Sequence, residues 1–311
     1  MPTKRALLIG INYTATPSAR LYGCINDVVN VRNTLIDAYG YLDSNILMLR
    51  DDDKAKQPTK ANILNMMVNI IRNSAPGDTL WIHYSGHGTQ IRSNTGDESD
   101  GLTECIVPSD FNSAGIIDDN AIFNILGLAK CQLILCFDSC HSGTVCDLQY
   151  STNYTNGRLS WAVNNSKKLA NPNIIMLSGC RDAQTSADAY NDYSKQGVGA
   201  FTITMLETLR ANDHNISIGE LYKKICANLK ASGFPQIPVL SSSVFSPSFQ
   251  FSKTYANGVT LSSVKATANA TKDMVDAMSV NSLEGSKMRV DVVGVFPGYK
   301  PSMNLNMKRL F

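Results

Sequence analysis

The sequence has no apolar stretch long enough to span a bilayer and no excess of charge of either sign. Its 311 residues include 28 basic and 26 acidic side chains, a formal charge of +2. This balance gives no electrostatic basis for binding nucleic acid or a membrane surface. The start, Met1-Pro-Thr-Lys-Arg5, leads into a short apolar run and does not resemble a secretory signal. We therefore expect a soluble, cytoplasmic protein with neither a nucleic-acid nor a membrane partner.

Paired cysteine motifs are missing as well. The eight cysteines form no C-x-x-C pair and are too sparse for a disulfide scaffold. Apart from Cys24 and Cys140, we expect them to be buried free thiols in a reducing compartment. There is also no G-x-x-x-x-G-K-[ST] loop, and the lone pair of Gly86 and Gly88 is too weak a signal to predict a nucleotide site.

What the sequence does have is a regular alternation of short apolar runs with helical segments. Buried runs separated by helices predict an α/β fold with a mostly parallel sheet, covered by helices on both faces. The predicted strands are 5–11, 46–49, 78–84, 104–107, 131–137, 173–177, 237–241 and 247–252, and the predicted helices are 24–39, 59–73, a stretch from Asp119, 199–210 and 217–231.

The alternation is interrupted twice. Residues 89–103 are polar and acidic, which predicts a loop, and residues 148–172 are rich in Asn, Ser, Thr and Tyr, which predicts an exposed linker. We therefore divide the domain 1–252 into the parts 1–147 and 173–252, joined by that linker. Residues 253–311 form an extension without an assigned role, in which only 288–296 resembles a strand.

Two strand ends carry reactive side chains. In an open parallel sheet, functional groups gather at the carboxyl ends of the strands. His87 follows one buried run between Gly86 and Gly88, and Cys140 follows another among small residues. A cysteine nucleophile needs a nearby imidazole, so these two side chains form a candidate dyad. Either alone is more often structural. The other histidines, at 83, 141 and 214, are better explained as a strand residue, a side chain pointing away from the nucleophile and a turn residue.

The segments H-Y-S-G-H-G at 83–88 and D-S-C-H-S-G at 138–143 together resemble the two catalytic motifs of the metacaspases, a family in the caspase-like clan. The similarity extends over about residues 4–252, without the Pro/Gln-rich segment that precedes the domain in many type I members. It implies a sheet of about six strands and a monomeric cysteine endopeptidase acting on proteins or peptides. Further matching segments are G-C-I-N-D-V at 23–28, I-I-D-D at 116–119, S-G-C-R-D-A-Q-T-S-A-D at 178–188, G-A-F-T at 199–202 and Q-I-P-V-L-S-S-S at 236–243.

The resemblance implies roles for individual residues. Cys140 would be the nucleophile and His87 the general base and acid, and the backbone N–H groups of Cys140 and Gly88 would form the oxyanion hole. Strand geometry places Asp138 on the face of Cys140 and Ser85 on the face of His87. In metacaspases, the residues corresponding to Asp138, Asp27 and Cys24 line a pocket for a basic side chain. Two carboxylates there favour cleavage after Arg or Lys.

The family also suggests calcium and self-cleavage. Many metacaspases bind calcium through four aspartates, and here Asp118, Asp119 and Asp147 match three of them while Thr103 takes the fourth position. Because calcium prefers six to eight oxygen ligands, we expect activation by calcium but weaker binding, unless Glu104 or Asp100 contributes or Thr103 supplies its hydroxyl or carbonyl oxygen. Self-cleavage is expected in the linker, at Arg158, Lys167 or Lys168.

Two alternatives stay open on the sequence alone. The first is a caspase-clan peptidase with a different specificity, such as one that cuts after Asp or Asn. The second is a catalytically silent protein that keeps the fold for scaffolding or for handling aggregates.

Overall fold

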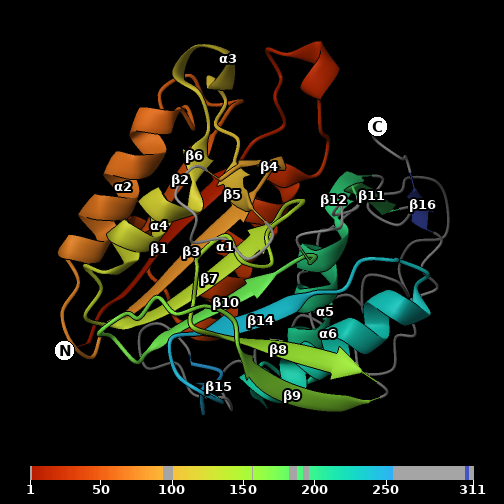
Figure 1. The fold of residues 1–311 in the computed structure, drawn as a ribbon. Coiled ribbons are helices and arrows are strands. Elements are labelled where there is room, and N and C mark those ends of the chain that lie inside the picture. Colours follow the sequence, from red (N-terminus) through yellow and green to blue (C-terminus); the bar gives the residue numbers. More distant parts are fainter. Residues whose placement is uncertain are drawn as a thin grey trace, which may run out of the picture.

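The computed structural model describes residues 2–93, 101–155, 157–181, 188–191, 196–254 and 305–307. Its centre is an eight-stranded sheet of order β2-β1-β3-β7-β10-β14-β8-β9 (Figure 1). The first five strands in this order run parallel, and the last three are antiparallel to their neighbours. The strands are β1 (Lys4–Gly10), β2 (Ile46–Arg50), β3 (Thr79–Ser85), β7 (Gln132–Asp138), β8 (Tyr150–Thr155), β9 (Arg158–Val163), β10 (Ile174–Ser178) and β14 (Val239–Ser242).

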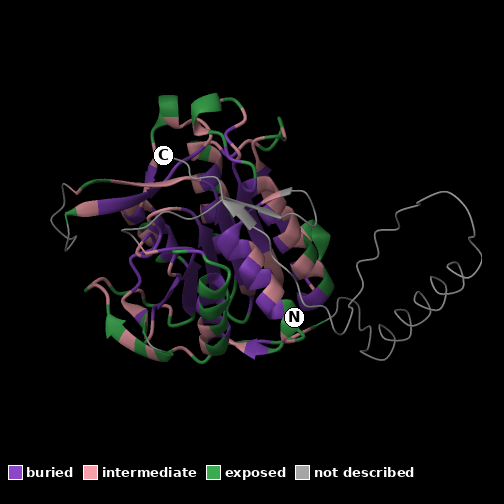
Figure 2. Ribbon diagram, turned by 90° about the vertical axis from the view of Figure 1, so that its right-hand side faces the viewer, coloured by how far each residue is buried: buried purple, intermediate pink, exposed green. Residues whose placement is uncertain are grey.

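Helices cover both faces of this sheet. The helices α1 (Cys24–Tyr39), α5 (Ala200–Ala211) and α6 (Ile218–Ala231) pack into one hydrophobic core, and α2 (Lys60–Arg72) and α4 (Asp119–Leu126) pack into the other. Figure 1 shows α2 and α4 to the left of the sheet, with α5 and α6 to its lower right. Figure 2 shows the buried strands enclosed between helices whose outer residues are exposed.

Local sequence explains where these helices start and stop. Thr59 accepts a hydrogen bond from the Asn62 backbone at the start of α2, and Asp118 accepts one from the Ala121 backbone at the start of α4. Each side chain satisfies a backbone donor that the first helical turn leaves open. Helix α1 ends at Gly40, whose φ of 68° is a left-handed conformation that glycine adopts without strain.

Short elements complete the fold. The strands β4, β5 and β6 form a three-stranded sheet, β13 pairs with β15, and β11 pairs with β12 and β16. None of the helices in the described ranges is both long and apolar enough to cross a membrane. The short helices and strands of the fold are η1 (Pro17–Ala19), η2 (Asp43–Asn45), β4 (Gly88–Arg92), β5 (Leu102–Ile106), α3 (Phe111–Ala114), β6 (Ile117–Asp118), β11 (Asp188–Asn191), β12 (Gln196–Gly199), β13 (Ile216–Ser217), β15 (Gln250–Phe251) and β16 (Leu305–Met307).

The sheet has eight strands where the family resemblance implied about six, and the reason lies in the segment 148–172. This segment is not a plain linker, because it contains the β8–β9 hairpin, which pairs with β14 and extends the sheet. The acidic segment 89–103 also differs, since it begins with β4, which pairs with β5. The strand expected at 288–296 lies outside the described residues, and the boundary at 252 stays a prediction.

Candidate active site

Cys140 differs from the other cysteines in its accessibility. It follows β7 directly and is partly exposed, whereas the other seven thiols are buried, and none of the eight forms a disulfide. Burial raises the pKa of Cys180 to about 12 and that of Cys226 to about 11. Thiols with such pKa values stay protonated and unreactive near neutral pH. The expected buried free thiols are confirmed, and Cys24 is buried with them.

His87 follows β3, the strand next to β7, so the two candidate side chains emerge at the same edge of the sheet. Two tyrosines fix its backbone. The His87 N–H donates to the Tyr13 hydroxyl over 2.8 Å, and the Tyr84 hydroxyl donates to the His87 carbonyl over 2.7 Å. The Tyr13 ring also lies against the imidazole, with ring centroids 4.6 Å apart. The histidine is therefore held in place from both sides.

The His87 imidazole has a defined hydrogen-bond partner. Its Nε2 lies 2.7 Å from the Ala19 carbonyl oxygen. Because a carbonyl can only accept, Nε2 carries the hydrogen and Nδ1 is left as the proton acceptor of the neutral ring. Desolvation lowers the pKa of His87 below 6.5, against the opposing effect of the Ala19 carbonyl. The neutral form, which can accept a proton, is thus favoured near neutral pH.

The backbones of Gly88 and Cys140 are in close contact. A Cβ atom added at Gly88 would lie only 1.9 Å from the Cys140 carbonyl oxygen. Such a contact is far below any van der Waals distance, so the position requires glycine. The two backbone segments expected to supply the oxyanion hole therefore lie side by side, next to the partly exposed thiol.

Two buried carboxylates, those of Asp27 and Asp138, lie close to Gly199. Asp27 in α1 accepts from the Ser85 hydroxyl over 2.6 Å and from the Gly199 backbone over 2.8 Å. Asp138 accepts from both the backbone and the hydroxyl of Thr202, over 2.9 and 2.8 Å. A Cβ atom at Gly199 would lie within 2.7 Å of an oxygen of each carboxylate.

The structure thus brings Asp27, Ser85 and Asp138, three of the four predicted substrate-binding residues, into one cluster. The fourth, Cys24, begins α1, and its backbone N–H donates to the Asn12 side chain over 3.0 Å. It is 6% exposed and lies on the same helix as Asp27, one turn earlier. Its role in binding stays a prediction.

Of the remaining histidines, His83 borders this cluster, since its Nε2 lies 3.5 Å from the Thr202 hydroxyl that donates to Asp138. His83 is fully buried in β3, and burial lowers its pKa to about 3. His214 packs edge-on against Tyr39, with ring centroids 5.5 Å apart, and burial lowers its pKa to about 4. Both are structural, as expected from the sequence.

The expected calcium ligands do not form a metal cage. Asp118 is used as the cap of α4, and the buried Asp119 accepts from the Glu104 backbone over 3.1 Å. Asp147 is 1% exposed and is bound by the Lys167 ammonium over 2.6 Å. Within the described part of the chain, no three acidic, His or Cys side chains are grouped so that they could hold a metal ion.

The other residues suggested as calcium ligands are either buried in the protein or lie outside the described residues. Glu104 is 2% exposed and accepts from Gln90 and Thr144, over 2.8 and 2.7 Å. Thr103 is buried in β5, and Asp100 lies outside the described residues. The oxygen donors are of the kind that calcium prefers, but their arrangement does not fit an ion without movement.

Comparison with known proteins shows the family. A family model described as "Metacaspase, peptidase C14 domain" matches residues 4–149. Metacaspase-2 of Trypanosoma brucei brucei is 36% identical over 256 residues, which cover 78% of this chain and 73% of that protein. Metacaspase-1 of Saccharomyces cerevisiae is 33% identical over 292 residues, covering 77% and 66%. The chain belongs to the metacaspase family. It is therefore a cysteine-type endopeptidase of the caspase clan.

A solved structure supports the fold. The crystal structure of protein GSU0716 from Geobacter sulfurreducens is similar with a TM-score of 0.54 and 20% sequence identity, over 81% of this chain and 95% of that one. The caspase-like arrangement of a mostly parallel sheet between two helical layers is thus confirmed for this metacaspase.

Several functional contacts of this metacaspase were missed from the sequence. The Ala19 carbonyl and the Gly199 N–H are backbone groups, so their role as hydrogen-bond partners cannot be recognised from the residue type. Thr202 lies in the quoted G-A-F-T segment, but its partner Asp138 is 64 residues away. Lys167 was noted only as a cleavage position, although the acidic Asp147 needed a counter-charge once buried.

Proposed function

We propose that this metacaspase hydrolyses peptide bonds after Arg or Lys, with Cys140 as nucleophile and His87 as general base and acid. One observation carries the proposal. Cys140, which alone of the eight cysteines is not buried, has its backbone against Gly88, and Gly88 directly follows the histidine whose Nδ1 is left as the acceptor. Nucleophile, base and backbone donors are thus present at one sheet edge.

The reaction follows from these groups. His87 Nδ1 takes the proton from the Cys140 thiol, and the thiolate attacks the carbonyl carbon of the cleaved bond. The resulting oxyanion accepts hydrogen bonds from the backbone N–H groups of Cys140 and Gly88. When the C–N bond breaks, the imidazolium gives its proton to the leaving amine and a thioester remains. Water, deprotonated by His87, then attacks the thioester, which releases the acid and restores the thiol.

Specificity for a basic residue before the cleaved bond is supported by the charge of the pocket. Asp27 and Asp138 are 1% and 5% exposed, and the donors named above, from Ser85, Gly199 and Thr202, are neutral. Two carboxylates so close together in a region of low dielectric attract a guanidinium or ammonium group and repel a carboxylate. A substrate with Asp before the cleaved bond is therefore disfavoured.

Self-cleavage is supported at one of the three expected positions. Arg158 is paired in the β8–β9 hairpin, and the Lys167 ammonium is held by Asp147. Lys168 is exposed, in a segment over 164–173 that has neither helix nor strand. Peptidases bind an extended, accessible chain, so the cut is expected after Lys168. Mass spectrometry should find it in the purified wild type and not in Cys140→Ala, and the uncut form should already be active.

Calcium enters the proposal as a weak activator. Its ligands would be Asp118, Asp119 and Asp147, and the ion would supply the positive charge that Lys167 now supplies to Asp147. Because Lys167 must leave first, binding is expected to be weaker than in family members with four matching aspartates. Full activity in excess chelator would contradict this part of the proposal.

A fluorogenic Arg-coumarin amide tests the central claim. The wild type should release the fluorophore, and Cys140→Ala and His87→Ala should be at least a hundredfold slower, since each removes a proton-transfer or nucleophilic step worth about two orders of magnitude or more. His141→Ala, next to the nucleophile, is the matched control and should retain more activity. A Cys140→Ala variant as active as the wild type would exclude the mechanism and favour the scaffold alternative.

A further inference from the structure

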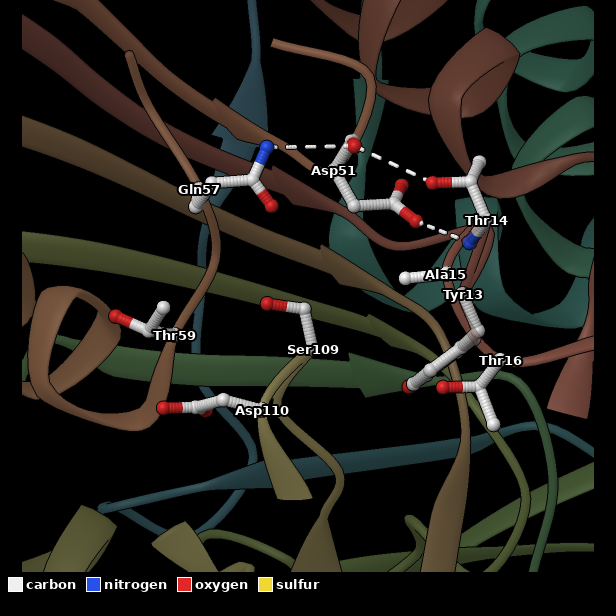
Figure 3. Close-up of a pocket in the computed structure, with 9 residues that line it drawn as sticks. All are labelled: Tyr13, Thr14, Ala15, Thr16, Asp51, Gln57, Thr59, Ser109 and Asp110. Carbon is white, nitrogen blue, oxygen red and sulfur yellow. Dashed lines mark hydrogen bonds between the residues drawn. The ribbon is translucent and has the colours of Figure 1, made fainter. Parts of the chain in front are cut away.

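A cavity of about 210 Å³ opens next to Tyr13 at the same edge of the sheet (Figure 3). It lies where the loops after β1 and β2 meet the loops before α2 and α3. In Figure 3 the Ala15 methyl and the Ser109 hydroxyl point into the space between these loops. The lining residues are Tyr13, Thr14, Ala15, Thr16, Asp51, Gln57, Thr59, Ser109 and Asp110.

The cavity has a fixed place relative to the proposed dyad. Along the sheet the strands run β7, β3, β1, β2, so the edge presents Cys140, then His87, then Tyr13, then Asp51. Tyr13 separates the cavity from the histidine, and its ring lies on the imidazole with centroids 4.6 Å apart. The cavity is thus on the far side of His87 from Cys140.

This order decides which part of a substrate reaches the cavity. The general acid must stand beside the nitrogen of the leaving amine, so the chain after the cleaved bond passes on the His87 side of Cys140. The residue before the bond points instead to Asp27 and Asp138. We propose that the cavity is a subsite that binds the side chain of the first or second residue after the cleaved bond, with a preference for Lys or Arg. This inference rests on the peptidase mechanism proposed above.

The lining explains the preference for a cation. Asp51 is held rigidly, because its Oδ1 accepts from the Asn12 backbone over 2.9 Å and its Oδ2 from the Thr14 backbone over 2.7 Å. Asp110 accepts from the Lys60 backbone over 2.8 Å. The donors of these three hydrogen bonds are neutral peptide groups, so they fix the positions of the two carboxylates without supplying a counter-charge.

The size of the cavity limits what it binds. Sites for drug-sized ligands have volumes of about 300–1,000 Å³, so this smaller cavity fits one side chain rather than a cofactor. Hydroxyl groups of Thr14, Thr16, Thr59 and Ser109 surround the space and can accept hydrogen bonds from an ammonium or guanidinium group. An acidic side chain there would face two like charges.

The test compares two substrates on the full-length protein. One is the Arg-coumarin amide, which has no residue after the cleaved bond, and the other is a set of quenched peptides with Arg before the bond and Lys, Ala or Glu at the next two positions. In the wild type, kcat/KM should be about tenfold higher for Lys than for Glu, the effect of about 1.4 kcal/mol of differential binding.

Two variants test whether the preference for Lys over Glu arises in the cavity. Asp110→Asn keeps an acceptor oxygen for the Lys60 backbone but loses the charge, and should reduce the Lys/Glu ratio at least threefold. Ala15→Trp fills the cavity and should lower kcat/KM for the Lys peptide at least ten times more than for the coumarin amide. Ala231→Trp, at an exposed alanine of α6, is the control and should leave the ratio of the two substrates unaltered.

The outcomes separate this inference from the mechanism. Cleavage of the coumarin amide with equal rates for the Lys and Glu peptides would overturn the subsite while the peptidase assignment stands. An unchanged Lys/Glu ratio in both Asp110→Asn and Ala15→Trp would do the same. A protein that cleaves neither substrate would overturn the mechanism and the subsite together.

Discussion

Replacing Lys167 by Met is expected to destabilise the protein in the absence of calcium and to tighten calcium binding. The Lys167 ammonium bridges the Asp147 carboxylate over 2.6 Å and the Asn120 side-chain oxygen over 2.9 Å. Its side chain is 21% exposed, whereas that of Asp147 is 1% exposed. Removing one partner of a largely buried ion pair costs about 3 kcal/mol, because the other charge stays buried without a counter-charge, even though the Asn165 side chain still donates to Asp147 over 3.0 Å. Methionine keeps the packing over Phe123, whose ring centroid lies 5.8 Å from the ammonium.

This free energy sets the size of both effects. For a domain of this size, a loss of about 3 kcal/mol lowers Tm by roughly 6–12 °C. If Asp147 is a calcium ligand as proposed, the ion has to break the same ion pair in the wild type before it binds. Since about 1.4 kcal/mol corresponds to a tenfold change in Kd, the variant should bind calcium about a hundredfold more tightly. Calcium at about a hundred times Kd should then restore about 2.7 kcal/mol of stability.

Isothermal titration and thermal unfolding, both in the Cys140→Ala background, measure these effects without self-cleavage. Lys168→Met is the matched control, because its side chain is exposed in the same segment and should alter neither Tm nor Kd. The reasoning is refuted if Lys167→Met melts at the same temperature in calcium and in chelator, or if its Kd for calcium lies within about threefold of that of the wild type. Either result would mean that Lys167 and calcium do not compete for Asp147.

Three further predictions concern the sheet edge and its surroundings. Because burial lowers the pKa of His83 to about 3, its neutral form stabilises the fold above pH 6.5, and this stability is lost as the pH falls from about 6.5 towards 3, at about 1.4 kcal/mol per pH unit. Urea unfolding measures the loss of stability between pH 7 and pH 5, and the wild type should lose about 2 kcal/mol more than His83→Gln does. An equal loss in the two proteins would contradict this. Asp138→Asn should lower kcat/KM for an Arg substrate about 10–100-fold, the contribution of one charge-assisted hydrogen bond, and should leave the Thr202 hydroxyl with an acceptor. An unaltered preference for Arg over Gln in this variant would exclude Asp138 from the pocket. Gly88→Ala should reduce kcat about a hundredfold, since its Cβ would displace the Cys140 backbone, and near-normal turnover would count against the proposed oxyanion hole.

The parts of the fold that could be predicted are those in which one sequence signal decides the outcome. Helix α1 was expected over 24–39 and is found at Cys24–Tyr39, because its apolar period ends at a glycine that stops a helix. His87 and Cys140 were placed at strand ends, and the two strands are neighbours in the sheet. Continuous apolar runs identify buried parallel strands well, since such strands are covered on both faces.

The β8–β9 hairpin was missed although the sequence contains a signal for it. Asn156-Gly157 is the dipeptide most typical of a two-residue hairpin turn, and the four residues that follow, Arg158-Leu-Ser-Trp161, alternate between polar and apolar side chains. The many polar residues obscured this pattern, because β9 is an edge strand whose residues are half-buried or exposed. Composition alone therefore predicted a linker where pairing with β14 forms a strand.

The missed contacts of the site are those that join distant parts of the chain. Asp27 and Gly199 are 172 residues apart, and Asp138 and Thr202 are 64 apart. No local sequence pattern predicts that the start of α5 contacts α1 and the end of β7. The partners were therefore visible only once the order of the strands had brought both parts of the domain to one sheet edge.

The loop after β1 joins the catalytic histidine to the cavity beyond it. Its start is fixed by the two backbone hydrogen bonds to Asp51, and its end by Asn12, whose side-chain oxygen accepts from the first backbone N–H group of α1. Between these points the loop supplies the Tyr13 hydroxyl and the Ala19 carbonyl to His87. Because the loop is anchored at both ends, the tautomer of His87 is set before any substrate binds. Groups held in advance need no reorganisation during the reaction, so in the proposed mechanism this loop acts by positioning His87 rather than through a reactive side chain of its own.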